Sequence, residues 1–158
     1  GNRSKEIIDY MIKHPEIKCV QGNHEKMLLD SLDNVKWASQ DFFHNGGTKT
    51  LESYGLFGHA GLYSFPKDHE NYIRSLPLYF ETDKLIISHS ADIRDNWSRS
   101  FSVYPLETTK FHIYGHTNKK KPVFSRKYCC IDTGCVFGNT LSAVHYPSKK
   151  VFSQPNID

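Results

Sequence analysis

No stretch of this sequence approaches the roughly 18 consecutive apolar residues that a membrane-spanning helix requires. Its opening residues also do not form a secretory signal peptide. The expected location is therefore cytoplasmic, with no membrane partner, although a truncated start would hide any targeting segment.

The sequence has few cysteines, and their spacing matches no known zinc-site or disulfide pattern. The spacing fits neither a paired CxxC zinc site nor the dense ladder of a small secreted scaffold. We therefore expect buried free thiols in a reducing compartment rather than disulfides. The cysteines are Cys19, Cys129, Cys130 and Cys135.

A strong charge of either sign is missing too, since the formal net charge is only +3. Nucleic-acid binding usually requires a concentrated basic stripe. The one basic cluster, at residues 119–121, precedes Pro122 and is typical of a solvated loop. No nucleic-acid partner is expected.

The apolar spacing in the first third of the chain predicts an α/β fold. A helix is predicted over residues 4–13, with Ser4 as its N-cap. Its expected apolar stripe is Ile7, Ile8, Met11 and Ile12. A strand over residues 17–20, a glycine turn and a helix over about 25–32 follow. This order directs the turn residues to the carboxyl edge of a sheet.

The rest of the chain continues the pattern. Helices are predicted over residues 48–54 and 69–75, with a loop over 55–66. The sequence contains no repeat, low-complexity tract or convincing linker, so residues 1–158 are expected to form one domain. The predicted strands span residues 85–88, 111–114, 128–132, 141–145 and 151–152, the last three with hairpin-like turns between them.

Three of the predicted strands lead to a possible metal ligand: Asn23, His89 and His116. Because parallel strand ends gather at one edge of a sheet, these side chains can converge. An amide oxygen and two neutral imidazoles suit Zn, Mn or Fe, although the set lacks a carboxylate. Each residue alone is a weak signal, because a histidine after a strand is more often structural. The histidines without this context receive no role: His14, His44, His59, His69, His112 and His145.

The residues that flank these three candidates make the metal-site prediction more specific. Gly22-Asn23-His24-Glu25, Ser88-His89-Ser90 and Gly115-His116-Thr117 occur in this order. The set resembles the last three motifs of the calcineurin-like metallophosphoesterases. The tail at residues 130–138 and 141–143 looks like that of the phage lambda type and bacterial Ser/Thr protein phosphatases. Short segments at 21–27, 45–47, 53–55 and 76–79 match the same group, so the resemblance spans nearly the whole chain.

The resemblance implies a role for each matching residue. Asn23, His89 and His116 would hold one of two divalent metal ions, for which manganese is the first expectation and iron or zinc the alternatives. His24 would be the general acid that protonates the leaving alkoxide, a task that suits histidine near neutral pH. The two ions would share and acidify a water molecule. No other cofactor is expected.

The family also places an arginine on the phosphate, within a Trp-x-Arg segment. Trp97-Ser98-Arg99 fits this pattern, and a guanidinium fork suits phosphate geometry. The segment after Arg99 is one residue shorter than is usual in the family. Arg94 is the alternative candidate for the phosphate-binding arginine. A solvated surface arginine remains the alternative for both.

The sequence departs from the family pattern at two places. The family begins with GDxHG and GDxxDRG motifs, and neither occurs here. Gly1 aligns with the end of the second motif, so the other metal's ligands and the bridging aspartate are expected upstream. Ser90-Ala91-Asp92 also replaces the commoner Ala-Gly after the second histidine.

The implied fold is the four-layer αββα metallophosphoesterase sandwich, without its first βαβ portion. The implied reaction is metal-dependent hydrolysis of a phosphomonoester, with a phosphoprotein or a phosphorylated small molecule as substrate and a Ser/Thr protein phosphatase as the leading interpretation. One alternative is a hydrolase of dinucleoside polyphosphates such as diadenosine tetraphosphate. The other is a non-catalytic remnant that binds metal or a partner. The 158 residues alone are expected to be inactive.

Overall fold

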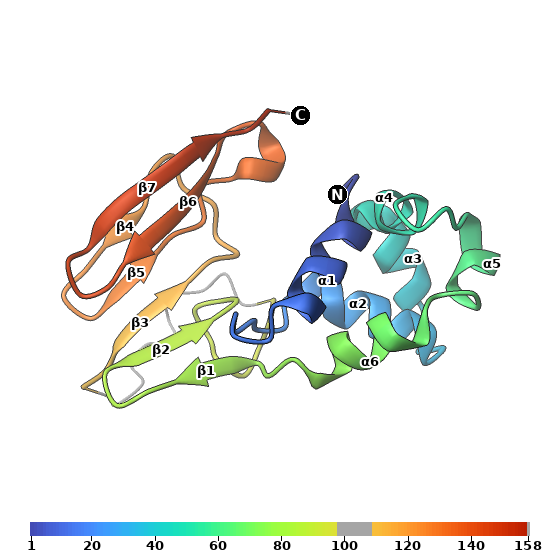
Figure 1. Cartoon of the computed structure of the whole chain (residues 1–158), viewed down its shortest axis with the longest axis horizontal. Helices are drawn as coiled ribbons and strands as arrows, with labels where there is room; N and C mark the ends of the chain where they lie inside the picture. The colour runs from blue at the N-terminus through green and yellow to red at the C-terminus, as the bar shows by residue number, and fades with distance from the viewer. Residues whose placement is uncertain (98–108, 158) are drawn as a thin grey trace. The chain divides into compact units, whose positions relative to one another are not determined.

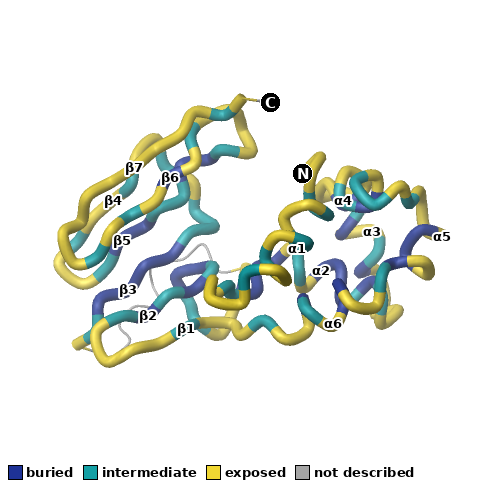
Figure 2. Tube along the Cα trace, viewed as in Figure 1, coloured by how far each residue is buried: buried dark blue, intermediate teal, exposed yellow. Residues whose placement is uncertain are grey.

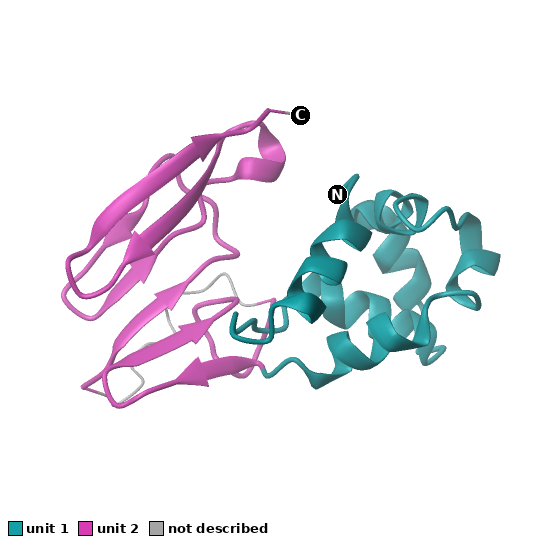
Figure 3. Ribbon diagram, viewed as in Figure 1, with its two compact units in different colours: residues 1–77 teal, residues 78–158 magenta. Residues whose placement is uncertain are grey.

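The computed structural model describes residues 1–97 and 109–157, and the chain divides into two compact units (Figure 3). Residues Gly1–Pro77 form a helical unit, and Leu78–Asp158 form a sheet unit. Arg99, a predicted site residue, lies outside the described residues. The single-domain expectation stays a prediction.

The helical unit contains six short α-helices and one π-helical turn among its residues (Figure 1). The predicted helices are present, and α5 lies in the segment that was wrongly predicted to be a loop. None of the helices in the described part of the chain is long and apolar enough to cross a membrane. The helices are α1 (Ser4–Lys13), α2 (Asn23–Leu32), α3 (Ala38–Phe42), α4 (Thr48–Glu52), α5 (Gly58–Leu62) and α6 (Lys67–Ser75), with the π-helical turn η1 at Phe43–Gly47.

One apolar core holds the helical unit together, and α2 supplies much of it (Figure 2). The predicted stripe of α1 is only partly covered, because Ile8 packs against this core while Ile7 is 56% exposed. The N-cap of α1 is Arg3, so the prediction of Ser4 was wrong by one residue. The buried core residues are Met27, Leu28, Leu29, Phe42, Leu51, Leu62, Phe65 and Ile73.

Residues 17–20 do not form the predicted strand. A strand needs the backbone hydrogen bonds of a neighbouring strand, and an apolar run alone does not supply them. Ile17 is 38% exposed, and the nearby Gln21 N–H donates to the carbonyl of Pro77 at 2.8 Å. The segment is an irregular connection that leads into α2.

The sheet unit is built on a five-stranded mixed sheet of order β1-β2-β3-β5-β4 (Figure 1). The central strands β2, β3 and β5 are parallel neighbours, and β1 and β4 pair antiparallel at the edges. A second sheet is the antiparallel hairpin of β6 and β7. The strands are β1 (Tyr79–Glu81), β2 (Leu85–Ser88), β3 (Phe111–Tyr114), β4 (Val123–Phe124), β5 (Tyr128–Cys130), β6 (Thr140–His145) and β7 (Lys150–Pro155).

Both faces of the five-stranded sheet carry buried side chains. Phe111, Ile113 and Cys129 pack on one face, where Val144 of β6 and Tyr146 cover them. The opposite face holds a second cluster formed by Ala91, Tyr114 and Cys130, with Tyr128 packed against it. The mixed α/β class is therefore as expected, while the four-layer arrangement stays a prediction.

The predicted hairpin between β6 and β7 is present. The second predicted hairpin, in which the turn at residues 132–134 would pair β5 with β6, is not formed. β5 instead pairs with β3 and β4. The carboxyl end of β5 therefore lies at the same edge of the sheet as the carboxyl ends of β2 and β3.

Candidate metal centre at the strand ends

His89 and His116 lie side by side at the carboxyl edge of the five-stranded sheet. His89 directly follows β2, and His116 comes two residues after the parallel strand β3. His89 Nε2 lies 3.0 Å from His116 Nδ1. Both side chains are half-buried, and their ring centroids are 4.8 Å apart. The parallel pairing of two strands thus joins residues that are 27 positions apart.

The backbone at His116 has an uncommon conformation. Its φ is +62°, in the left-handed region that residues other than glycine rarely adopt. The Thr117 N–H donates to the carbonyl of Gly115 at 2.8 Å, which closes a γ-turn around His116. The Gly115 N–H donates to the carbonyl of His89 at 2.9 Å. Such turns cost free energy and are concentrated at functional sites.

The donor chemistry of this pair fits a divalent metal ion. Two nitrogen ligands at about 2.0–2.1 Å from one ion would lie about 3.0–3.4 Å apart. The observed 3.0 Å matches this separation, and it also matches an imidazole–imidazole hydrogen bond in the metal-free state. Among residues 1–97 and 109–157, no group of three or more His, Cys, Asp and Glu side chains could hold an ion. The two histidines can therefore supply part of a coordination shell.

Asn23 and His24 occupy the first turn of α2, rather than the turn before it that the sequence predicted. Asn23 is buried at 5% exposure, whereas His24 keeps much of its surface in water. Glu25 of the same motif accepts a hydrogen bond from the Gly22 N–H at 2.8 Å and so caps the helix. The motif thus fixes the local geometry of Asn23 and His24 through a helix start.

Desolvation lowers the pKa of His24, and the nearby charge of Glu25 only partly opposes it. The positive end of the helix dipole acts in the same direction as desolvation. A general acid must carry its proton before the reaction. His24 would therefore need an acidic partner that raises its pKa.

Arg94 and Trp97 lie in the loop that follows His89. The exposed Arg94 guanidinium contacts the Asp92 carboxylate, with Nε 3.2 Å from Oδ1. Trp97 places its ring edge-on to His116, with centroids 6.4 Å apart, and remains 45% exposed. The Trp-x-Arg segment thus begins beside the histidine pair.

Asp132 is a residue at this edge to which the sequence reasoning gave no role. It follows β5, and its Cβ would lie 3.7 Å from a Cβ built on Gly115. Its Oδ1 accepts from the Gly134 N–H at 2.9 Å, and its carbonyl accepts from the Lys119 N–H at 2.9 Å. Asp132 therefore shapes the two turns next to the histidines. Its position two residues after the end of β5 was the available signal.

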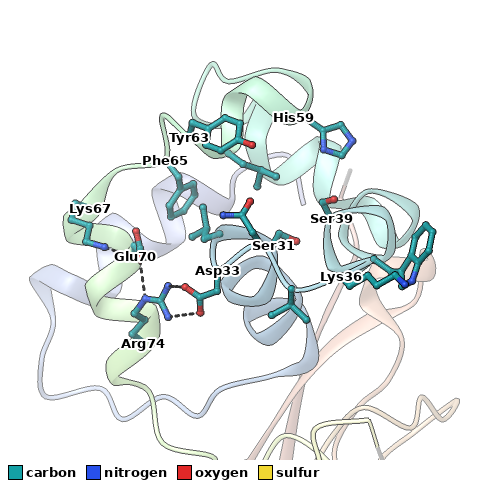
Figure 4. A pocket seen from close by; sticks show the side chains of 15 residues that line it. Ser31, Asp33, Lys36, Ser39, His59, Tyr63, Phe65, Lys67, Glu70 and Arg74 are labelled. Carbon is teal, nitrogen blue, oxygen red and sulfur yellow. Dashed lines mark hydrogen bonds and ion pairs between the residues drawn. The ribbon is translucent and has the colours of Figure 1, made fainter.

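The helical unit has a separate cavity of about 830 Å³ (Figure 4). Its lining includes a charge network in which Arg74 binds Asp33 at 2.6 Å and Glu70 at 2.8 Å. Lys67 binds Glu70 at 2.8 Å. The polar groups of this network satisfy one another, which indicates a structural role.

Known proteins similar to this chain are named as nucleotide hydrolases. The bis(5'-nucleosyl)-tetraphosphatase PrpE [asymmetrical] of Geobacillus thermodenitrificans is 28% identical over 102 residues, which is 64% of this chain and 40% of that protein. The protein of the same name from Bacillus cereus strain Q1 is 30% identical over 101 residues, covering 62% of this chain and 38% of that protein. The matched part thus spans about 40% of the length of these curated relatives. No family model matches the chain.

A crystal structure of a protein proposed to be a diadenosine tetraphosphatase shares the fold. It superimposes with a TM-score of 0.62 over 97% of this chain and 74% of that one, at 16% identity. Together with the curated relatives, this similarity supports the broad resemblance to metallophosphoesterases. It does not support the narrower assignment to the Ser/Thr protein phosphatases, and the similar proteins agree better with the alternative interpretation.

Proposed function

We propose that this protein is a metal-dependent phosphoesterase that hydrolyses dinucleoside polyphosphates. The observation that carries the proposal is the 3.0 Å contact between His89 and His116 at adjacent parallel strand ends. Both histidines belong to motifs that occur in the family's order, with Asn23 and His24 in the preceding one. The names of the curated relatives supply the substrate class.

The surroundings of the histidine pair also favour a nucleotide substrate over a phosphoprotein. Trp97 offers an exposed aromatic ring next to His116. Nucleobases stack on such rings, and each stack contributes about 1–3 kcal/mol. A phosphoserine side chain has no planar group that would use the same surface.

In this proposal Asn23, His89 and His116 hold one divalent ion, with manganese expected first and iron or zinc as alternatives. When bound, the metal centre acidifies a water molecule and withdraws charge from the phosphoryl oxygens. Arg99 binds the phosphate that is attacked. Residues for a second ion are not assigned within this chain.

His24 would donate a proton to the leaving oxygen. In a dinucleoside polyphosphate this oxygen belongs to a phosphate, which accumulates charge far more readily than an alkoxide because its own pKa is near 6. The demand on His24 is therefore smaller for this substrate than for a phosphoserine. Desolvation lowers the pKa of His24 and so leaves it less protonated near neutral pH, which costs less for a leaving group that needs the proton less.

The test is a substrate panel measured on the complete gene product, including any sequence that precedes Gly1. Diadenosine tetraphosphate, a phosphoserine peptide and p-nitrophenyl phosphate are compared with Mn²⁺ present and after chelation. The proposal predicts metal-dependent cleavage in which kcat/KM for diadenosine tetraphosphate exceeds that for the peptide. A preference for the peptide would restore the protein phosphatase interpretation. No turnover of any substrate would favour a non-catalytic protein.

A further inference from the structure

His112 is a buried histidine in the middle of β3, between the apolar residues Phe111 and Ile113. Its exposed fraction is 0%. A polar ring at such a position costs stability compared with an apolar side chain unless hydrogen bonds satisfy it. Desolvation lowers the pKa of His112 to about 4, so the imidazole is neutral near pH 7.

Ser88 is one partner of this imidazole. The strand register pairs Ile86 with His112 and Ser88 with Tyr114, which makes Ser88 and His112 diagonal neighbours on one face. His112 Nε2 lies 2.6 Å from Ser88 Oγ. The Ser88 hydroxyl in turn donates to the carbonyl of Ser90 at 2.6 Å.

These two contacts determine which atom carries each hydrogen. The Ser88 hydroxyl has one hydrogen, and the Ser90 carbonyl can only accept it. The contact to His112 must therefore use a hydrogen on the imidazole. His112 is thus the Nε2–H tautomer, donating to Ser88 Oγ.

The same network fixes the backbone on both sides of His89. Ser90 is 1% exposed, and its hydroxyl contacts the carbonyl oxygens of Asp92, at 2.9 Å, and of Asp95, one of which accepts its single hydrogen. The backbone of His89 itself is held by β3, since its carbonyl accepts a hydrogen bond from the Gly115 N–H at 2.9 Å. His89 thus lies in a turn that is held at Ser88, at Ser90 and at Gly115.

We propose that His112 is a positioning residue for the pair formed by His89 and His116. Its imidazole orients the Ser88 hydroxyl toward the Ser90 carbonyl, and this turn directs the His89 ring toward His116. His112 acts through Ser88 and touches neither metal nor substrate. The proposal does not depend on which phosphate ester is hydrolysed.

Three variants separate positioning from packing. His112→Phe keeps a buried ring and removes the N–H donor. His112→Gln restores an N–H donor of similar reach, and Ser88→Ala removes the intermediate hydroxyl. His145→Phe is the control, because His145 is exposed on β6 and its Nδ1 contacts Ser148 at 2.7 Å. Circular dichroism establishes that each variant is folded.

The first readout is NMR of the metal-free protein with ¹⁵N-labelled histidine. We expect a Nε2–H signal for His112, and nitrogen–nitrogen coupling across the His89–His116 contact in the wild type, His112→Gln and His145→Phe. The coupling should vanish in His112→Phe and Ser88→Ala. A Nδ1–H tautomer of His112, or unchanged coupling in folded His112→Phe, would overturn the proposal. If His112→Phe does not fold, Ser88→Ala decides in the same way.

The second readout is Co²⁺ affinity by titration. Residues that orient metal ligands typically contribute 10–100-fold, so both disruptive variants should bind Co²⁺ about 10–100-fold more weakly. The double variant His112→Phe/Ser88→Ala should bind no more weakly than either single variant, because both interrupt one path. Additive losses would contradict the proposal. If the wild type binds no Co²⁺, the metal site under Proposed function fails, and the NMR readout alone decides the role of His112.

Discussion

The indole of Trp97 stands edge-on to the imidazole of His116, with ring centroids 6.4 Å apart and planes at 87°. This places an exposed aromatic surface beside the candidate metal ligands, at the start of the segment that leads to Arg99. If this surface binds a nucleobase, Trp97→Ala should raise KM for diadenosine tetraphosphate about 5- to 100-fold, because one stack contributes about 1–3 kcal/mol. Trp97→Phe should retain much of the affinity.

Tripolyphosphate is the matched ligand for the Trp97 prediction, because it carries the phosphates without a base. Its inhibition constant should be the same in the wild type and in Trp97→Ala. An equal loss of affinity for both ligands would show that Trp97 supports the site structurally and does not bind a base.

His24→Asn tests the proposed proton donor. General acid catalysis typically contributes 10²–10⁴-fold, so kcat for an alkyl phosphate should fall by about that factor while metal content is retained. The loss should be smaller for diadenosine tetraphosphate, because its leaving oxygen needs the proton less. Equal losses for alkyl, aryl and anhydride substrates would remove the acid role from His24.

Arg99 and Arg94 can be distinguished by parallel replacements. Arg99→Ala should lower kcat/KM about 10- to 100-fold, because a hydrogen bond to a charged group contributes about 1.5–3 kcal/mol. Arg94 already binds Asp92 on the protein surface, and exposed ion pairs contribute little. Arg94→Ala should therefore stay within about threefold of the wild type. The reverse ranking would transfer the phosphate role to Arg94.

Glu70 links acid stability to the charge network of the helical unit. Hydrogen bonds from Lys67 and then Arg74 hold the pKa of Glu70 below its usual value. A carboxyl group with a lowered folded pKa stabilises the fold above its unfolded pKa of about 4.3, and this contribution is lost as pH falls through the folded value.

Glu70→Gln should therefore lower Tm at pH 7, and the difference from the wild type should shrink as the pH falls below about 4. Glu52→Gln is the control, because Glu52 forms an exposed pair with Lys49 at 3.1 Å and should change Tm very little. If the Tm difference between Glu70→Gln and the wild type were the same at pH 7 and pH 3, the lowered pKa of Glu70 would be contradicted.

The central strands β2 and β3 could be predicted to the residue from the sequence, whereas β5 ends at Cys130, two residues before its predicted end. β2 and β3 are short, largely apolar runs, with β3 buried along its whole length and β2 buried at alternate residues. Their ends at Ser88 and Tyr114 are marked by the change in residue type. The parallel rule then brings His89 and His116 together without any side-chain detail. The edge strands β1 and β4 were missed because three and two residues carry too little periodicity.

Other features depend on contacts that no local pattern reveals. The strand predicted at residues 17–20 failed because strand formation depends on a partner elsewhere in the chain. The γ-turn at His116 arises from a backbone hydrogen bond between Gly115 and Thr117. His112 received no role because its significance depends on the register that places it beside Ser88. A polar ring inside an apolar strand was the one available sign.

The most direct test of the account is the metal content of His89→Ala and His116→Ala, measured by equilibrium dialysis against Mn²⁺ and elemental analysis. His145→Ala, at an exposed position on β6, is the matched control. If His89 and His116 bind one ion together, each variant should bind about one ion fewer per chain than the wild type and the control, with the fold retained. Wild-type Mn²⁺ content in both folded variants would contradict the account.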